Sequence, residues 1–316
     1  MNVIRFQYPF SPEQLDIPAT GQVLAVGFFD GVHRGHQKLL RDSVHLAKAK
    51  GIPASVLTFD PHPREVLRTV ANAKYITPLA EKLRCFRELK LDRTYILAFD
   101  RGLSQLAPRA FIDKVIIPLR ASHLVVGFNF TFGHLGRGTA ETLREEAEGR
   151  YQVNVVRPFH VDGDRVSSTL IRELMHEGSI ARVNELLGRP YRIVGRVVAG
   201  EGRGRTLGIP TANLRPTDPY FIPARGVYAV RAMHGDKRYE GVMNIGVKPT
   251  FHDTEAQALE VHLLDFSGDL YGEELKVEII DRLRSERKFA SAEALVKQIH
   301  EDIINARSAL ERPNSY

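Results

Sequence analysis

The spacing of apolar residues divides this chain into two parts. Between residues 22 and 178, short apolar runs alternate with segments whose apolar residues recur every three or four positions. The runs predict strands buried on both faces, and the recurring segments predict amphipathic helices. The predicted strands are 23–27, 54–59, 94–98, 124–127 and 152–156, and the predicted helices are 35–50, 79–89, 109–119, 139–149 and 169–177. This alternation predicts an α/β domain with a parallel sheet covered by helices on both faces.

A short helix is expected at 179–187, and Gly188-Arg189-Pro190 then breaks the pattern. Beyond this point apolar and polar residues alternate, which predicts antiparallel strands. The expected strands are 191–198, 226–233, 238–245, 259–264 and 276–283, with a hairpin at Gly235-Asp236. Five or six such strands predict a small closed barrel. We therefore predict domains at 1–185 and 186–316.

A last helix is expected from residue 292 to 310. Ser291 is suited to cap its first turn, and Leu295, Ile299, Ile303 and Leu310 follow one another at helical spacing. We expect this apolar face to pack on the barrel.

The composition narrows the class of protein. The 316 residues are 43% hydrophobic and 26% charged, as in ordinary globular proteins, and a single cysteine excludes an internal disulfide. No apolar run approaches the roughly 20 residues of a membrane span, and the N-terminus lacks a signal-peptide core, so we expect a cytoplasmic protein without a membrane partner. The net charge of +6 suits a phosphate-rich partner. Because the charges are dispersed, small phosphates are favoured over nucleic acid, and the oligomeric state stays open.

Residues 27–36, Gly-Phe-Phe-Asp-Gly-Val-His-Arg-Gly-His, join the first predicted strand to its helix. Small residues let a ligand approach the backbone, and the first amides of a helix attract anions, so a phosphate site is expected here. His33 and His36 would add two donors. The two histidines could also be a pair of metal ligands, but the sequence lacks the glutamate that accompanies such a pair in zinc proteases. Cys85 is the only cysteine in the chain. Two ordinary surface histidines are the remaining alternative.

The predicted α/β part contains three more polar clusters. In residues 59–63, Asp60 precedes two turn-forming prolines, which indicates either a plain capped turn or part of a site. Residues 126–133 alternate aromatic and polar side chains, which suits either a core or a face for a flat ring. Residues 166–172 place three hydroxyls and Arg172 at a helix start. They form either an N-cap or a second anion site.

The barrel region carries its own candidate chemistry. Residues 200–208 are rich in glycine and contain Arg203 and Arg205, and Thr211 and Asn213 follow. This stretch is either a mobile loop before a proline turn or a phosphate site whose neutral oxygens complete a magnesium shell.

Further along, Glu260 and His262 share one face of a predicted strand. Glu260 is a candidate base for a hydroxyl nucleophile if that face lies at the barrel mouth, and a solvated residue otherwise. Residues 284–289 mix charge with an aromatic side chain and would by themselves indicate a solvated loop.

Together these stretches resemble the prokaryotic bifunctional riboflavin kinase/FAD synthetases over nearly the whole chain. Residues 33–36 are similar to the His-x-Gly-His signature of nucleotidyltransferases, and residues 166–172 to their Ile-Ser-Ser-Thr-x-Ile-Arg signature, with Val166 in place of isoleucine. Residues 207–213, 244–251, 260–265 and 284–289 match the kinase part, where Ile209 replaces a frequent phenylalanine. Two independent sets of motifs in the right order make chance agreement improbable.

The resemblance implies a Rossmann-like nucleotidyltransferase domain that converts FMN and ATP to FAD and pyrophosphate, and a barrel that phosphorylates riboflavin to FMN. It implies that His33 and His36 stabilise the α-phosphate and the leaving pyrophosphate, and that Glu260 activates the ribityl hydroxyl. The other residues implied are Gly27, Phe29, Gly35, Asn129, Ser167, Ser168, Thr169, Arg172, Arg203 and Arg205 for ATP and its phosphates, Asp60, Phe128, Arg284 and Glu286 for the flavin, and Thr211 and Asn213 for Mg²⁺.

The sequence leaves two alternative functions open. One is an RNA-binding protein with a degenerate first domain and an OB-like barrel, which the basic pI permits. The other keeps adenylyl transfer alone and uses the barrel as a flavin reservoir, which would leave Glu260 idle.

Overall fold

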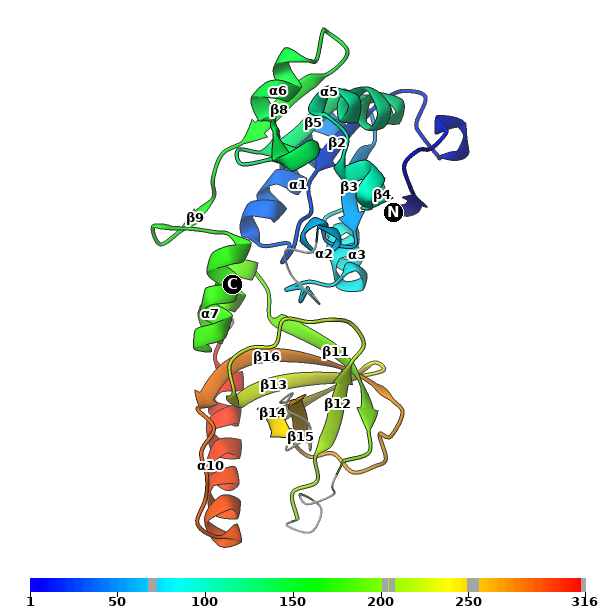
Figure 1. The fold of residues 1–316 in the computed structure, drawn as a ribbon. Helices are drawn as coiled ribbons and strands as arrows, with labels where there is room; N and C mark the ends of the chain where they lie inside the picture. The colour runs from blue at the N-terminus through cyan, green and yellow to red at the C-terminus, as the bar shows by residue number, and fades with distance from the viewer. Residues whose placement is uncertain (68–72, 201–203, 205–207, 249–255, 314–316) are drawn as a thin grey trace. The chain divides into compact units, whose positions relative to one another are not determined.

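The structure is a computed structural model that describes residues 1–67, 73–200, 204, 208–248 and 256–313. The chain divides into two compact units, Met1–Ser167 and Ser168–Tyr316. Figure 1 colours the first from blue to green and the second from green to red. The predicted domain boundary between residues 185 and 186 stays a prediction.

The first unit is built on a six-stranded parallel sheet, as the sequence predicts, in the order β1-β4-β3-β2-β5-β8. Its strands are β1 (Asn2–Phe6), β2 (Gln22–Val26), β3 (Ala54–Asp60), β4 (Arg93–Ala98), β5 (Ala121–Gly127) and β8 (Gln152–Val156). The sequence analysis missed β1, which adds to the sheet beside β4. The strand order reverses between the neighbours β2 and β5, and in open parallel sheets ligands bind beyond the carboxyl ends of the strands at such a point.

Two apolar cores lie on opposite faces of this sheet because successive residues of a strand point to opposite sides. Val23 and Ala25 of β2 belong to the core that contains α1 and α3, whereas Leu24 and Val26 belong to the core that contains Phe111 and Leu143. The helices of the first unit are α1 (Arg34–Lys50), α2 (Pro63–Val66), α3 (Leu79–Glu88), α4 (Arg101–Ser104), α5 (Pro108–Phe111) and α6 (Ala140–Glu145), and the short strands are β6 (Thr131–Phe132), β7 (Gly138–Thr139), β9 (His160–Val161) and β10 (Asp164–Arg165). Helices therefore cover both faces, as predicted.

The helix predicted at 109–119 is not regular. After α5 the chain forms a π-helical segment, η2 (Ile112–Ile116), and then a 3₁₀ turn, η3 (Ile117–Leu119). Pro118 lacks an N–H and its ring crowds the carbonyl four residues earlier, which disfavours a continuous α-helix there. The helix predicted at 139–149 is also shorter, since α6 ends at Glu145.

The second unit begins with α7 (Ser168–Glu177) and α8 (Ile180–Leu187) and continues into a closed antiparallel barrel in the order β11-β12-β15-β14-β13-β16. The barrel strands are β11 (Tyr191–Val198), β12 (Ala212–Pro216), β13 (Gly226–His234), β14 (Lys237–Lys248), β15 (Ala256–Leu263) and β16 (Glu274–Arg284). The expected hairpin at Gly235-Asp236 joins β13 to β14. The sequence analysis did not assign β12 as a strand, because Pro210 suggested a turn.

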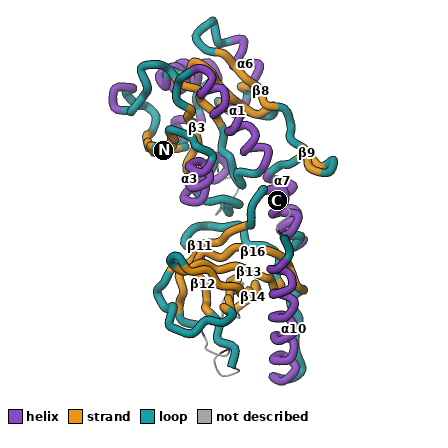
Figure 2. Tube along the Cα trace, turned by 180° about the vertical axis from the view of Figure 1, so that it is seen from behind, coloured by secondary structure: helices purple, strands orange, loops and turns teal. Residues whose placement is uncertain are grey.

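Helix α10 (Ala292–Glu311) lies along the barrel, as expected (Figure 2). Ser291 Oγ accepts a hydrogen bond from the amide of Ala294, which confirms the predicted cap. Ala306 and Leu310 pack against Val227 and Ala229 of β13.

Candidate active sites

The turn after β2 has an unusual backbone. Phe29 (φ 57°), Gly31 (φ 86°) and Val32 (φ 39°) all lie in the left-handed region. This conformation is unfavourable for Phe29 and Val32, which are buried at 3% and 0% exposure. Gly27 is required beside them, since a Cβ there would lie 2.9 Å from the Phe29 ring. Strained backbone of this kind persists only where the surroundings hold it, and it concentrates at functional sites.

His33 and His36 lie together at the start of α1. His33 is the N-cap, and its Nδ1 accepts a hydrogen bond from the amide of His36 at 3.3 Å. The two rings stack with their centroids 3.7 Å apart. Since Nδ1 of His33 is the acceptor, the neutral ring carries its proton on Nε2, which leaves that nitrogen as a donor. A Cβ at Gly35 would lie 3.2 Å from the His33 ring, so glycine keeps this space open.

The segment after β5, the strand next to β2, contributes Phe128 and Asn129. The amide of Phe128 bonds to the carbonyl of Val156 at 3.1 Å, which ties this segment to β8. Phe128 is 42% exposed and its ring lies under the guanidinium of Arg165, 5.7 Å away. Phe130 and Phe132 instead pack in the core near Phe111, so only the first of the three aromatic residues is available to a ligand. Of the three alternating aromatic residues, Phe130 and Phe132 thus belong to the core, whereas Phe128 offers an exposed ring.

Asp60 ends β3 on the other side of β2, and its carboxylate lies 3.6 Å from Arg5 of β1. The candidate residues after β2, β3 and β5 are therefore brought to one edge of the sheet, at the reversal of strand order. A cavity of about 480 Å³ adjoins this edge, between α1 and the end of β8. It is lined by Lys38, Asp42, Leu46, Val125, Asn154, Val155, Val156, Arg157, Pro158 and Phe159.

The second nucleotidyltransferase-like motif spans the division of the chain. Ser167 ends the first unit, whereas Ser168, Thr169 and Arg172 lie in α7 of the second. The guanidinium of Arg172 lies 5.9 Å from the ring centre of Phe221. The proposed convergence of these side chains on one phosphate stays a prediction.

A cavity of about 510 Å³, within the range of small-molecule sites, lies between the barrel strands and α10. Thr211, Asn213, Glu260, Arg284 and Glu286 all line it, so the structure brings together every predicted barrel residue that it describes. Arg203 and Arg205 lie outside the described residues. His262 also lines the cavity, and its Nδ1 lies 2.7 Å from the carbonyl oxygen of Pro210.

Glu260 lies between two asparagines in the barrel sheet. It is the register partner of Asn213 on β12 and of Asn244 on β14. Directly paired residues of adjacent strands point to the same face, and all three line the cavity. Asn213 is 8% exposed, and its Oδ1 has no hydrogen-bond partner among the residues that the structure describes. Sequence reasoning did not select Asn244, because only the strand register shows that it adjoins Glu260.

The opposite wall of the cavity comes from the last strand and α10. Asp302, Leu295 and Ile299 of α10 line it together with Arg284 and Phe289. The guanidinium of Arg284 lies 5.6 Å from the ring centre of Phe289. Glu286 approaches Gly246, where a Cβ would lie only 2.8 Å from Oε1 of the glutamate. Asp302 is a further site residue that the sequence analysis missed, since an aspartate on a polar helix suggests solvent exposure.

Comparisons with known proteins give matches to both parts of the chain. The family model described as riboflavin kinase matches residues 187–310, and the one described as FAD synthetase matches residues 17–170. The bifunctional riboflavin kinase/FMN adenylyltransferase of Bacillus subtilis is 41% identical over 89% of this chain and 90% of its own length. The chain belongs to the bifunctional riboflavin kinase/FMN adenylyltransferase family. Its relative from Listeria monocytogenes is 39% identical over 98% of both chains.

A solved structure named as a macrolide-efflux protein from Streptococcus pneumoniae is also similar, at 33% identity and a TM-score of 0.88 over 97% of this chain and 99% of that one. Within the described part of the chain, no helix combines the length and apolarity needed to cross a membrane.

The chain is thus a bifunctional, ATP-using transferase of flavin biosynthesis, with its FAD synthetase region N-terminal and its flavokinase region C-terminal. This confirms the fold and the activities that the resemblance implies. The family models favour this interpretation over the RNA-binding and flavin-reservoir alternatives.

Proposed function

We propose that the barrel cavity is the riboflavin kinase site and that Glu260 is its general base. The observation that carries this proposal is the position of Glu260 on the cavity wall between Asn213 and Asn244. Glu260 would take the proton from the terminal ribityl hydroxyl of riboflavin as that oxygen attacks the γ-phosphate of ATP. The new bond gives FMN, and ADP leaves. The flanking amides would orient the hydroxyl and the transferred phosphate.

The apolar part of the cavity suits a flavin ring. Val227, Val242, Leu295 and Ile299 provide apolar surface, and Arg284 and Glu286 provide polar groups at its margin. A cavity with mostly apolar walls and a few placed polar groups is typical of sites for flat cofactor-like ligands.

Thr211 and Asn213 are the residues that would hold Mg²⁺ in this site. The buried Oδ1 of Asn213 without a described partner fits a group that supplies a ligand. Among the described residues no three His, Cys, Asp or Glu side chains gather as a metal site, so the protein would provide neutral oxygens while ATP phosphates and water complete the shell. Bound there, the ion would neutralise charge on the ATP phosphates. Arg203 and Arg205 are proposed to add positive charge.

The first unit is proposed to transfer AMP at the reversal between β2 and β5. The FMN phosphate is already ionised and attacks the α-phosphate of ATP, pyrophosphate leaves, and no protein nucleophile is needed. Positioned donors are sufficient to stabilise the charge of such a transition state. His33 and His36, stacked at the helix start, would donate to the α-phosphate and the leaving pyrophosphate.

Other residues of this unit are proposed to bind around that centre. Gly27, Phe29 and Gly35 shape the phosphate-binding turn, and Asn129 contacts ATP. Ser167, Ser168, Thr169 and Arg172 hold the β- and γ-phosphates. Asp60 and the exposed ring of Phe128 contact the flavin. The cavity between α1 and β8 would take the adenosine part of ATP, because it lies beside the start of α1 and is lined by Asn154 and Phe159.

Riboflavin, FMN and ATP are the proposed partners, and the cytoplasm is the proposed compartment. Neither nucleic acid nor membrane is proposed as a partner, because the positive charges are dispersed along the sequence.

Chromatography of flavins after incubation with riboflavin, ATP and Mg²⁺ tests the kinase proposal. We expect Glu260→Gln to lower FMN formation by about 10²- to 10⁴-fold, the usual contribution of a general base. FMN supplied directly should still become FAD. Glu274→Gln, an exposed glutamate on β16, is the control and should match the parent. Parental FMN formation by Glu260→Gln would show that Glu260 is not the base.

A further inference from the structure

Lys82 of α3 is a buried charge that neither proposed mechanism uses. It is 2% exposed, although most lysines lie at the surface. In the sequence it occupies the apolar face of α3, three and four residues before the buried Cys85 and Phe86. A lysine at such a position needs a partner that offsets the loss of hydration.

The partner is the phosphate-binding turn. Lys82 Nζ donates to the backbone carbonyl of Phe28 at 2.7 Å and lies 3.8 Å from the centre of the Phe28 ring. The hydroxyl of Thr58 donates to the same carbonyl at 3.1 Å. Residue 28 is therefore held from α3 and from β3, immediately before the left-handed residues Phe29, Gly31 and Val32.

The charges around Lys82 belong to the same region. Asp30 of the turn is 4% exposed and accepts a hydrogen bond from the amide of Thr77 at 3.1 Å. Burial is the largest effect and lowers the pKa of Lys82 to about 8. The negative charges of Asp30 and Asp60 act in the opposite direction because they favour the charged ammonium. Asp60 also faces Arg5.

An aromatic cluster covers the other side of residue 28. The Phe28 ring lies 4.0 Å from His62 and 6.1 Å from Tyr75, measured between ring centres, and the Tyr75 hydroxyl donates to Glu65. Among the described residues, titratable groups near the lysine and its partner thus include Asp30, Asp60, His62, Glu65 and Tyr75.

We propose that Lys82 is a positioning residue for adenylyl transfer. By holding the Phe28 carbonyl and balancing Asp30 and Asp60, it keeps the strained turn in the shape that presents His33 and His36 to the α-phosphate. The inference rests on the proposed role of that turn. It goes beyond that role because Lys82 would act through the Phe28 carbonyl and the two aspartates.

The test measures FAD formation from FMN in the full chain, with riboflavin phosphorylation in the same protein as the internal reference. We expect Lys82→Met to lower kcat for adenylyl transfer by about 10²-fold, the usual effect of a small misplacement of catalytic groups, with less change in KM for ATP. Riboflavin phosphorylation should be unchanged. Lys114→Met, an exposed lysine of η2, should behave as the parent in both reactions.

The pH dependence of kcat for adenylyl transfer distinguishes a positioning role of Lys82 from a merely structural one. The parent alone gives this profile, even if Lys82→Met folds poorly. In the parent and in Lys114→Met, kcat for adenylyl transfer should fall above about pH 8, where Lys82 loses its charge. Lys82→Met should lack this fall. A parent profile that stays flat to pH 10, or a folded Lys82→Met with parental kcat, would overturn the inference.

His36→Ala distinguishes failure of the inference from failure of the proposed site. If His36→Ala loses adenylyl transfer and Lys82→Met keeps it, only the role of Lys82 is wrong. If His36→Ala keeps adenylyl transfer, the proposed role of the turn is wrong. The proposed role of Lys82 is then wrong too, because it depends on the role of the turn.

Discussion

The guanidinium of Arg284 and the carboxylate of Asp302 form a two-point ion pair between the end of β16 and helix α10. Nε lies 2.9 Å from Oδ1 and Nη2 lies 2.8 Å from Oδ2. The Asp302 side chain is 3% exposed and that of Arg284 is 19% exposed. Gln298 adds a donor to Oδ1 at 2.9 Å. The helix thus fixes a charged group on the wall of the proposed riboflavin kinase cavity.

Asp302→Asn is expected to loosen that wall. Removing one charge of a buried pair leaves Arg284 uncompensated, which typically costs about 3–5 kcal/mol of stability. We expect a lower thermal midpoint and a riboflavin KM raised about tenfold, equivalent to about 1.4 kcal/mol. Arg307→Gln removes an exposed ion pair to Asp265 from the same helix and is the matched control. An unchanged riboflavin KM in Asp302→Asn would mean that the pair does not position Arg284 for the flavin.

Asn213→Ala tests the proposed magnesium ligand. Because the variant lacks the buried Oδ1, we expect riboflavin phosphorylation to need a higher Mg²⁺ concentration for its half-maximal rate. Adenylyl transfer from supplied FMN should keep its original Mg²⁺ dependence. The two dependences are measured on one preparation by titrating Mg²⁺. An identical shift in both reactions would place the effect outside the barrel site.

His123 at the start of β5 should make the protein sensitive to acid. Burial, the largest effect, and nearby Lys50 lower the pKa of His123 in the folded protein, while Gln152 acts in the opposite direction. Between this lowered pKa and the unfolded value of about 6.5, the unfolded chain binds more protons, so stability falls as the pH falls through this window. At pH values above this window, the contribution of His123 to the free energy of unfolding is constant.

Thermal unfolding of the parent and of His123→Gln, followed from about pH 7.5 to 5, measures this contribution. The parent should lose more stability than the variant on acidification. Parallel pH dependences in the two proteins would exclude His123 as a source.

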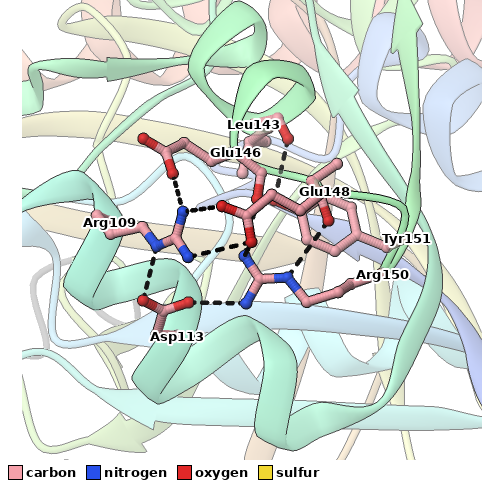
Figure 3. A network of polar contacts seen from close by, with 8 residues as sticks. Arg109, Asp113, Leu143, Glu146, Glu148, Arg150 and Tyr151 are labelled. Atoms are coloured by element: carbon pink, nitrogen blue, oxygen red, sulfur yellow. Dashed lines mark hydrogen bonds and ion pairs between the residues drawn. The ribbon is translucent and has the colours of Figure 1, made fainter.

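A network of charges joins α5 and η2 to the segment after α6 (Figure 3). Arg109 donates to Asp113 at 2.8 Å, to Glu148 at 2.6 Å and to Glu146. Arg150 donates to the other oxygen of Asp113 at 2.9 Å. Hydrogen bonds from Arg109 first, and from Arg150, lower the pKa of Asp113. The network is largely exposed, so its contribution should depend on salt.

Arg109→Gln is expected to lower the thermal midpoint at low ionic strength. The difference from the parent should shrink in about 1 M NaCl, where the screening length is only about 3 Å. Arg101→Gln, an exposed arginine of α4, serves as the comparison. A difference that persists in high salt would indicate packing of the Arg109 side chain rather than charge.

The sequence predicted the fold well where local pattern and tertiary structure agree. The strand at 152–156 and the cap at Ser291 are examples, because period and capping chemistry are properties of neighbouring residues. β1 and β12 were missed because an edge strand is not apolar throughout, and because Pro210 suggested a turn just before Ala212.

The site residues that were missed depend on contacts between distant parts of the chain. Glu260 could be proposed from its strand, but Asn244 adjoins it only through the register of β14 and β15. Asp302 and Lys82 are charged residues on helices, and the residues near each in the sequence do not identify the distant partner that it is buried against. Contacts over such separations are set by the fold and not by the local pattern.

We propose that one chain carries two separate active sites, with Glu260 essential to one and His36 to the other. The most direct measurement is chromatography of flavins from Glu260→Gln, from His36→Ala and from their mixture, each supplied with riboflavin, ATP and Mg²⁺. We expect Glu260→Gln to leave riboflavin unchanged, His36→Ala to stop at FMN, and the mixture to form FAD because released FMN reaches an intact second site. FAD from either variant alone, at the parental rate, would contradict the assignment of Glu260 and His36 to two separate sites.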